Sequence, residues 1–183
     1  VEIVELFTTP ARAAGLLVHP ELRALAERGA AFELEAETAE KLSVTRSGQG
    51  VLAVVRVTRR EVVTDGIVVF LERVQDPGNV GAVVRSAAAF QASGVICSPG
   101  CGNPFSPKAV RGSSGLSLVL PIETNTPLET AATAFHAVGG EVAAAVGAGG
   151  LPAAKWQPGR ILLIVLGNEG AGLGRDLLDH TDT

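Results

Sequence analysis

The sequence predicts an α/β protein, with a mostly parallel sheet covered by helices on both faces and a small N-terminal α/β unit in front. Three observations carry this prediction. From residue 66 onward, strand-like and helix-like segments alternate. The strand-like segments, such as 67–71 and 161–166, are continuous apolar runs, which is typical of parallel strands buried on both faces. Aromatic residues make up only 4% of the chain, so the core must be built from Val, Leu, Ala and Ile.

The first 58 residues are expected to form the small N-terminal unit. Their patterns predict, in order, a strand over 1–7, a helix over 20–28, a short strand over 32–34, a helical turn over 38–42 and a strand over 51–57. Residues 43–50 are polar and contain glycine, which indicates a sharp connection. A second polar stretch begins at residue 59. We therefore assign 1–58 and 59–183 to separate domains.

The second domain repeats a strand-then-helix order. Its predicted strands are 67–71, 94–97, 116–120, 141–146 and 161–166, and its predicted helices are 79–90, 106–111, 127–138 and a final one starting near 174. Helix 79–90 places its valines on one face, which indicates packing against the sheet.

Composition limits the function classes. No apolar run approaches the roughly 20 residues that a membrane-spanning helix needs. Two cysteines, Cys97 and Cys101, are too few for a disulfide framework, and the three histidines show no metal-ligand spacing. We therefore expect no membrane, no metal and a reducing, cytoplasmic compartment. The chain contains no Met, which indicates a segment of a longer product.

The clustering of basic residues in one part of the chain indicates phosphate binding more clearly than the net charge does. The net charge is −4, but residues 41–111 carry 9 basic and 4 acidic side chains between two acidic flanks. Four basic residues are therefore candidates to contact phosphate groups: Arg59, Arg60, Lys108 and Arg111. An ordinary solvated surface explains the same charges, and charge alone favours that explanation.

Two segments carry unusual polar residues where predicted strands end, which is where ligands bind in open α/β sheets. Residues 72–81 read Glu-Arg-Val-Gln-Asp-Pro-Gly-Asn-Val-Gly and run into a helix, which Asn79 can cap. Residues 166–174 read Leu-Gly-Asn-Glu-Gly-Ala-Gly-Leu-Gly, a loop whose backbone can reach a ligand. Glu169 within it would repel phosphate, so a ribose or a sulfonium cation is the better match.

These segments resemble the signature motifs of the SpoU/TrmH family of RNA ribose 2′-O-methyltransferases. Residues 76–87 are similar to the first motif, 166–173 to the second, and 103–115 to the helix and turn between them. The resemblance implies the SPOUT trefoil-knot fold, S-adenosylmethionine as cofactor, RNA as substrate and a homodimer. Residues 1–58 resemble part of the family's substrate-binding domain, which favours ribosomal RNA over tRNA.

The resemblance also implies roles for individual residues. Arg85 would hold the RNA phosphate and stabilise the developing alkoxide, Asn79 would fix Arg85 or the sugar, and Glu169 would hold the loop or Arg85. The cofactor would contact Leu166, Gly167, Asn168 and Gly170. Two departures stand out. Gln91 occupies a position where the family usually has glycine, and the third motif is absent, which indicates that the C-terminal part of the domain is missing.

Three other interpretations stay open. A tRNA ribose methyltransferase fits the same motifs. A non-catalytic RNA-binding module of the same fold fits the absence of the third motif. An ordinary nucleotide-dependent Rossmann enzyme would need a helix-opening glycine loop followed by a ribose-binding acid, and the sequence contains no such pair.

Overall fold

The computed structural model describes residues 1–43, 48–58, 60–168, 170 and 172–183. Its contacts divide the chain into two compact units, Val1–Thr58 and Arg59–Thr183. Each unit has its own sheet, and each is described here by itself. Arg59, Glu169 and part of the expected connection at 43–50 lie outside the described residues.

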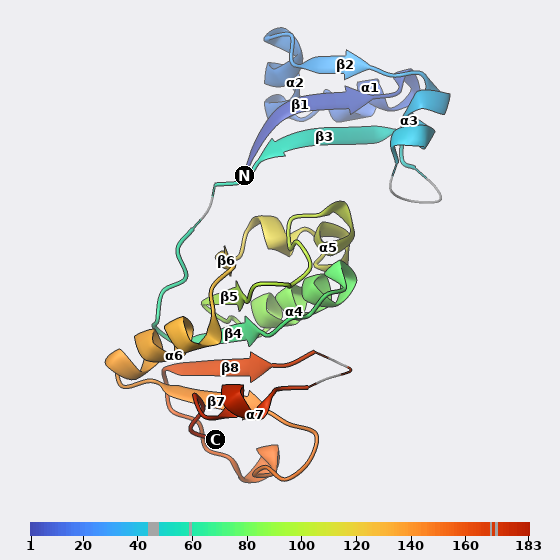
Figure 1. The fold of residues 1–183 in the computed structure, drawn as a ribbon. Coiled ribbons are helices and arrows are strands. Elements are labelled where there is room, and N and C mark those ends of the chain that lie inside the picture. Colours follow the sequence, from blue (N-terminus) through green and yellow to red (C-terminus); the bar gives the residue numbers. More distant parts are fainter. Residues whose placement is uncertain (44–47, 59, 169, 171) are drawn as a thin grey trace. The chain divides into compact units, whose positions relative to one another are not determined.

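The N-terminal unit is built on a three-stranded sheet with the order β2-β1-β3 (Figure 1). Strand β1 (Glu2–Thr8) runs parallel to β2 (Ala31–Glu33) and antiparallel to β3 (Val51–Arg56). Its helices are α1 (Pro10–Leu16), α2 (Pro20–Glu27) and α3 (Ala36–Leu42). Helix α1 was not predicted, although Pro10 at its first position is a common helix start.

The second unit contains a five-stranded, wholly parallel sheet with the order β6-β5-β4-β8-β7. The strands are β4 (Ile67–Leu71), β5 (Gly94–Cys97), β6 (Ile122–Thr124), β7 (Glu141–Ala145) and β8 (Leu162–Leu166). The helices are α4 (Pro77–Ala89), α5 (Pro107–Gly112), α6 (Leu128–Ala137) and α7 (Arg175–Leu178), with short 3-10 helices at Ala153–Lys155 and Leu116–Leu118.

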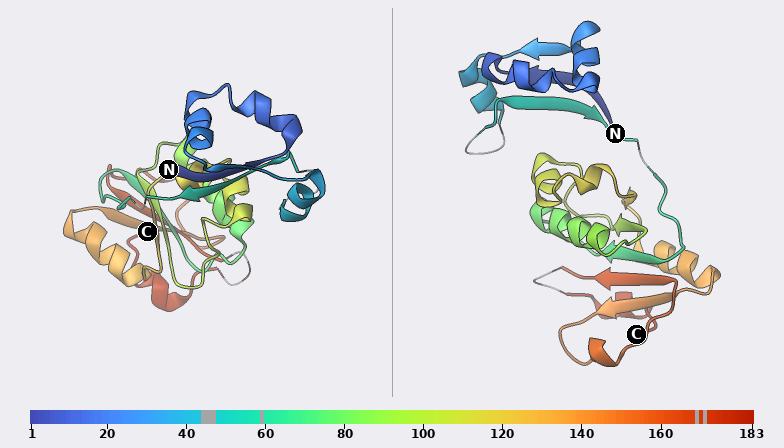
Figure 2. Two further views of the ribbon diagram at one scale, coloured as in Figure 1. Left: turned by 90° about the horizontal axis from the view of Figure 1, so that it is seen from above. Right: turned by 180° about the vertical axis from the view of Figure 1, so that it is seen from behind.

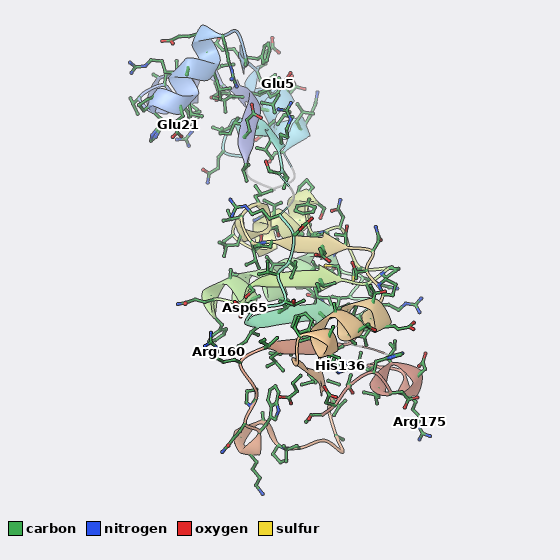
Figure 3. The ribbon with its side chains drawn as sticks, turned by 90° about the vertical axis from the view of Figure 1, so that its left-hand side faces the viewer. Glu5, Glu21, Asp65, His136, Arg160 and Arg175 are labelled. Atoms are coloured by element: carbon green, nitrogen blue, oxygen red, sulfur yellow. The ribbon has the colours of Figure 1, made fainter. Side chains whose placement is uncertain are left out.

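Helices cover both faces of this sheet, as the sequence predicts (Figure 2). Successive side chains of a strand point to opposite faces. Val68 and Phe70 of β4 accordingly pack into one core with Phe135 of α6, and Val69 and Leu71 pack into the other with the α4 valines. Figure 3 shows α6, which carries His136, and α7, which carries Arg175, on the same side of the sheet.

One predicted strand is wrong. Residues 116–120 were expected to be extended, but Leu116–Leu118 form a 3-10 helix and the edge strand β6 begins at Ile122. Gly115 precedes the turn with a φ of 84°, and the buried Ser117 hydroxyl lies 2.9 Å from that of Ser113. This hydrogen bond between the two serine hydroxyls stabilises a turn within an apolar stretch whose sequence is typical of a strand.

Two glycines allow α4 and α5 to approach closely. A Cβ atom added at Gly81 would lie 2.3 Å from the carbonyl oxygen of Ala109, and one at Gly112 would lie 3.0 Å from the carbonyl oxygen of Gly78. Real Cβ atoms essentially never come as close as 2.3 Å to backbone, and 3.0 Å is tighter than most Cβ contacts. The contact therefore depends on glycine, and it fixes α5 against the first turns of α4.

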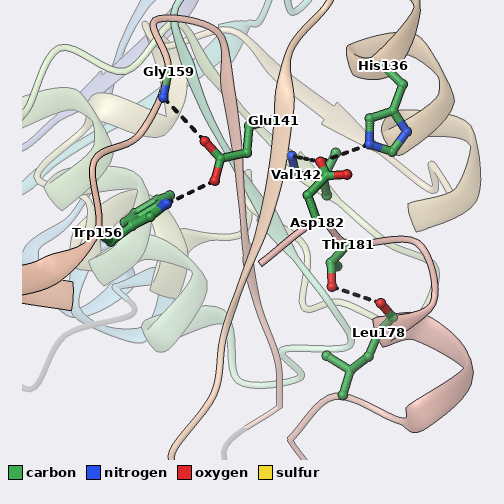
Figure 4. Close-up of polar contacts among 8 residues, drawn as sticks. All are labelled: His136, Glu141, Val142, Trp156, Gly159, Leu178, Thr181 and Asp182. Carbon is green, nitrogen blue, oxygen red and sulfur yellow. Dashed lines mark hydrogen bonds and ion pairs between the residues drawn. The ribbon is translucent and has the colours of Figure 1, made fainter. Parts of the chain in front are cut away.

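The segment after α7 lies along strand β7 (Figure 4). The Asp182 amide donates to the Val142 carbonyl at 2.7 Å, and the Asp182 carboxylate accepts from the Val142 amide at 2.8 Å. His136 Nε2 of α6 lies 3.1 Å from the same carboxylate. Among the described residues, no helix is long and apolar enough to cross a membrane.

We predict that Gly81→Ala lowers the free energy of unfolding of this unit by about 2 to 3 kcal/mol, because the new methyl group overlaps backbone that cannot move aside. Gly159→Ala is the matched control, since a Cβ there would meet only the Ile161 carbonyl oxygen at 3.9 Å. Urea denaturation of both variants measures the difference. Equal stabilities would show that α4 and α5 can separate without cost.

Candidate functional site

The carboxyl ends of all five strands of the second unit meet at one edge of the sheet, and the polar loops lie there (Figure 1). Strands β5 and β6 lie on one side of β4 in the sheet, and β8 and β7 lie on the other side. The order therefore reverses between β4 and β8. Ligands of open α/β sheets bind at this kind of position. Residues 72–76 follow β4 and residues 167–174 follow β8, so the two segments with unusual polar residues are neighbours.

Asp76, not Asn79, caps helix α4. The Asp76 carboxylate accepts hydrogen bonds from the Gly78 amide at 2.6 Å and from the Asn79 amide at 3.2 Å. Pro77 then occupies the first helical position, so the helix starts earlier than the predicted residue 79. Asn79 lies half-buried in the first turn and supplies a backbone amide to the cap. This corrects the predicted capping role of Asn79.

Lys108 ties α5 to that cap. Its ammonium nitrogen lies 2.5 Å from Asp76 Oδ2, which joins two residues that are 32 apart in sequence. This hydrogen bond from Lys108 and the one from the Gly78 amide hold the pKa of the Asp76 carboxyl below its ordinary value. Both side chains are partly exposed to solvent. Lys108, a predicted RNA-binding residue, therefore also contacts the start of α4.

Hydrogen bonds at Arg73 join the loop after β4 to the loops after β5 and β8. The Arg73 amide donates to Ser98 Oγ at 2.9 Å, which links the end of β4 to the end of β5. The Asn168 side-chain amide donates to the Arg73 carbonyl oxygen at 2.9 Å, which links the same residue to the loop after β8. The Glu72 amide continues the sheet by donating to the Leu166 carbonyl oxygen at 2.8 Å. The first and second sequence segments are therefore held together by direct hydrogen bonds.

The loop after β8 folds back on itself. Asn168 pairs with Gly172 as an isolated antiparallel bridge, and Asn168 Oδ1 accepts from the Gly170 amide at 2.8 Å. A Cβ atom at Gly167 would lie 2.7 Å from the carbonyl carbon of Gly172, so only glycine permits this turn. The predicted cofactor-binding residues Leu166, Gly167, Asn168 and Gly170 are thus brought together, and Glu169 between them lies outside the described residues.

One hollow lies between the loops that follow β4 and β8, and another lies at the end of the neighbouring strand β7. One of about 450 Å³ is lined by residues from both segments and from α7: Glu72, Arg73, Gln75, Asn168, Gly172, Gly174, Asp176 and Leu177. A larger one of about 580 Å³ lies at the end of β7 and includes the glycine-containing stretch 147–150 and Trp156. The Trp156 indole donates to Glu141 at 2.9 Å, which holds the wall of this hollow against β7 (Figure 4).

The basic side chains stay exposed. Arg85 lies on α4, six residues beyond Asn79, and its guanidinium makes no hydrogen bond or ion pair with any described residue. Arg111 is exposed in the last turn of α5, and Arg60 is exposed in the segment before β4. Among the described residues, no hydrogen bond from the Arg85 guanidinium joins it to Asn79. Arg59 lies outside the described residues.

The two cysteines lie at the carboxyl end of β5 as free thiols. Cys97 is buried, and its pKa is raised by the hydrogen bond with Cys101 and by burial. The Cys101 thiol lies 3.2 Å from the carbonyl oxygen of Leu71. Within the described ranges, no group of three or more His, Cys, Asp or Glu side chains is placed to hold a metal ion.

The sequence analysis missed Asp76 and Arg73 as residues that organise the site. A signal for Asp76 was present, because an acidic residue directly before proline is a common helix start. No comparable signal exists for Arg73, since its importance comes from its backbone partners on two other loops.

We predict that Asp76→Asn destabilises the fold at neutral pH because it removes the charge that pairs with Lys108. Since the folded-state pKa of Asp76 is lowered, its contribution is complete above the ordinary Asp pKa of about 4 and is lost as the pH falls through the folded value. In urea denaturation, the difference in stability between wild type and Asp76→Asn should therefore be constant at neutral pH and shrink as the pH falls below about 4. Asp76→Ala, which also removes the cap, should be less stable than Asp76→Asn. A difference that does not change with pH would contradict the ion pair.

The comparisons with known proteins agree with this arrangement. Residues 66–183 match the SpoU rRNA Methylase family. An uncharacterized tRNA/rRNA methyltransferase of Synechocystis is 36% identical over 111 residues, a match that covers 61% of this chain and 40% of the relative. The 23S rRNA (guanosine(2553)-2′-O)-methyltransferase of Bacillus subtilis is 26% identical over 151 residues, covering 82% of this chain and 60% of the relative. The chain thus spans only part of both curated relatives.

A solved structure shows the same fold across both units. The AdoMet-bound rRNA methyltransferase from Sinorhizobium meliloti superposes with a TM-score of 0.78 at 26% identity, over 98% of this chain and 69% of that chain. The family match covers the whole parallel sheet and both loop segments, as the resemblance at 76–87 and 166–173 indicates. The chain belongs to the SpoU rRNA methylase family.

Proposed function

We propose that this protein transfers a methyl group from S-adenosylmethionine to a ribose 2′-hydroxyl of RNA, with ribosomal RNA as the substrate class. The observation that carries the proposal is the hydrogen bond from Asn168 to the Arg73 carbonyl oxygen, which joins the second motif to the segment leading into the first motif at the carboxyl edge of the sheet. The curated relative from Bacillus subtilis is named as a 2′-O-methyltransferase of 23S rRNA, which supports the reaction and the RNA class. A tRNA substrate is the alternative.

The hollow at the end of β7 fits the cofactor. Its volume of about 580 Å³ lies within the range of small-molecule sites, roughly 300 to 1,000 Å³. Its walls combine alanine and leucine side chains with exposed glycine backbone, and Ala145 on its rim pairs with Leu166. Leu166, Gly167, Asn168 and Gly170 would hold the cofactor with backbone groups. The bound cofactor supplies an electrophilic methyl group.

Arg85 would act on the RNA. A ribose hydroxyl is a poor nucleophile, so the site must orient it in line with the methyl group and stabilise the negative charge that develops on its oxygen. A guanidinium does not lose its proton in proteins, so Arg85 cannot take the hydroxyl proton. It can hold a phosphate with two parallel hydrogen bonds and stabilise the alkoxide. In this proposal Asn79 positions the sugar or Arg85, and Glu169 supports the loop.

RNA capture would use further basic residues. Lys108 and Arg111 lie on α5, beside the start of α4, and Arg60 precedes β4. In this proposal they contact phosphates of the RNA together with Arg59. Residues 1–58 would serve as part of a substrate-binding domain. We also propose that the protein acts as a homodimer in the cytoplasm.

Methyl transfer to RNA tests the function. Incubation with S-adenosylmethionine labelled on the methyl group and unmodified ribosomal RNA transcripts should give label in RNA, at one nucleotide that becomes resistant to alkaline hydrolysis. Transfer RNA transcripts form the second arm. Absence of label in both RNA classes, for protein that binds the cofactor, would contradict the proposal.

We predict that Arg85→Ala abolishes this transfer and leaves the affinity for S-adenosylmethionine within a few-fold of wild type, measured by calorimetry. Arg85→Lys should fail as well, because an ammonium cannot reproduce the planar fork of a guanidinium. Arg85 is exposed, so neither substitution should disturb the fold. A lysine variant with near wild-type turnover would rule out the role given to the fork.

A further inference from the structure

Arg73 holds a backbone conformation that favours glycine. Its φ is 51°, in the left-handed region that non-glycine residues rarely adopt. The hydrogen bonds to Ser98 Oγ and from Asn168 keep it there from both sides. A residue in this region costs about 1 kcal/mol or more. Glycine would adopt this backbone conformation at lower cost than arginine. The presence of arginine therefore indicates that its side chain has a role.

The Arg73 side chain is exposed and free to bind a ligand. Its Cγ and Nε atoms lie 4.0 and 3.8 Å from the point where a Cβ atom of Gly100 would be, so the stem passes over the turn after β5. Within the part of the chain that the structure describes, its guanidinium makes no hydrogen bond or ion pair. The adjacent Glu72 is 8% exposed and does not pair with it.

Arg73 also stands between two hollows at the carboxyl edge. It lines the one of about 450 Å³ with Asn168 and Asp176, and a second one of about 370 Å³ with Ser98 and Pro99. Both open beside the position where the strand order reverses, between β4 and β8. Because Arg73 lines both hollows and its side chain is exposed, its guanidinium can reach a ligand that enters this edge from solvent.

We propose that Arg73 binds a phosphate of the RNA strand at this edge of the sheet, an inference that rests on the proposed function. A guanidinium fork matches phosphate oxygens. The carboxylates of Glu72 and Asp176 line the hollow behind Arg73, so an anion binds on the exposed side of the guanidinium rather than deep in the hollow. RNA approaches from that side. The carboxylate of the cofactor is the other anion within reach, and the test separates the two.

The conformation of Arg73 supplies a sharp test. Arg73→Gly removes the side chain and relieves the backbone, so it should leave the melting temperature unchanged or raise it by about 2 to 4 °C. Its matched control is Gln91→Gly. Gln91 also has a positive φ, 60°, and is exposed, but it precedes β5 at the opposite edge of the sheet. Arg73→Lys keeps the charge and the strained backbone.

Binding is measured with a fluorescent, mixed-sequence single-stranded RNA oligonucleotide over a series of salt concentrations. Arg73→Gly should weaken binding roughly tenfold and flatten the slope of log affinity against log salt by about 0.7, the value for one contact with single-stranded RNA. Gln91→Gly should match wild type in both quantities, and Arg73→Lys should keep the slope. The affinity for S-adenosylmethionine should be equal in all four proteins.

Two results would overturn the proposal: an unchanged RNA slope in Arg73→Gly, or a loss of cofactor affinity with RNA binding intact, which would assign Arg73 to the cofactor carboxylate. A drop in melting temperature large enough to unfold Arg73→Gly would contradict the strained backbone on which the argument stands. The RNA slope requires no methyl transfer. If the wild-type protein methylates no RNA, that result contradicts only the proposed function, and the effect of Arg73→Gly on RNA binding can still be interpreted.

Discussion

The hydrogen bond from the Asn168 side chain to the Arg73 carbonyl oxygen is the interaction on which the rest of the site depends. It spans 95 residues of sequence and joins the loop after β8 to the loop after β4. The same asparagine orders its own loop by accepting from the Gly170 amide. Because an amide side chain has both a donor and an acceptor, one residue can shape one loop and hold the next. The candidate cofactor contacts and the start of α4 are therefore parts of one hydrogen-bonded structure.

A second constraint places the basic side chains. Gly81 brings the backbones of α4 and α5 together, and the Asp76–Lys108 pair fixes α5 beside the first turn of α4. Arg85 lies two turns further along the same helix, so its position follows from a cap and a glycine that touch no substrate in the proposed function. The site is thus held by one close backbone approach, at Gly81, and by side-chain contacts of Asp76, Lys108 and Asn168. The guanidinium groups of Arg73 and Arg85 make no ion pair among the described residues.

The sequence predicts this architecture well where a single physical pattern decides the outcome. Continuous apolar runs identified β4, β5 and β8, and strand–helix alternation identified the parallel sheet with helices on both faces. The pattern failed at residues 116–120, where a buried pair of serine hydroxyls forms a turn within an apolar stretch. Local composition carries no information about a partner that only the fold brings near.

The motifs indicated the candidate site, but the contacts within it could be seen only in the structure. The first motif was recognised at 76–87, yet the cap belongs to Asp76 because the helix begins at Pro77. Gln91, noted as unusual where the family has glycine, has the left-handed φ that explains the preference. Arg73 shares that conformation, and no periodicity or spacing indicates it, since its backbone is fixed by Ser98 and Asn168 from other loops.

The coupling of the two loops can be measured directly by hydrogen–deuterium exchange with and without S-adenosylmethionine. Asn168→Asp keeps an acceptor for the Gly170 amide but replaces the donor to the Arg73 carbonyl oxygen with a carboxylate that repels it. In wild type, the cofactor should slow amide exchange in both 166–174 and 72–76. In Asn168→Asp, protection should persist in 166–174 and at Glu72, whose amide donates to the Leu166 carbonyl oxygen, and it should disappear from 73–76. Equal protection of 73–76 in both proteins would contradict the account, because the loops would then be coupled by something other than Asn168.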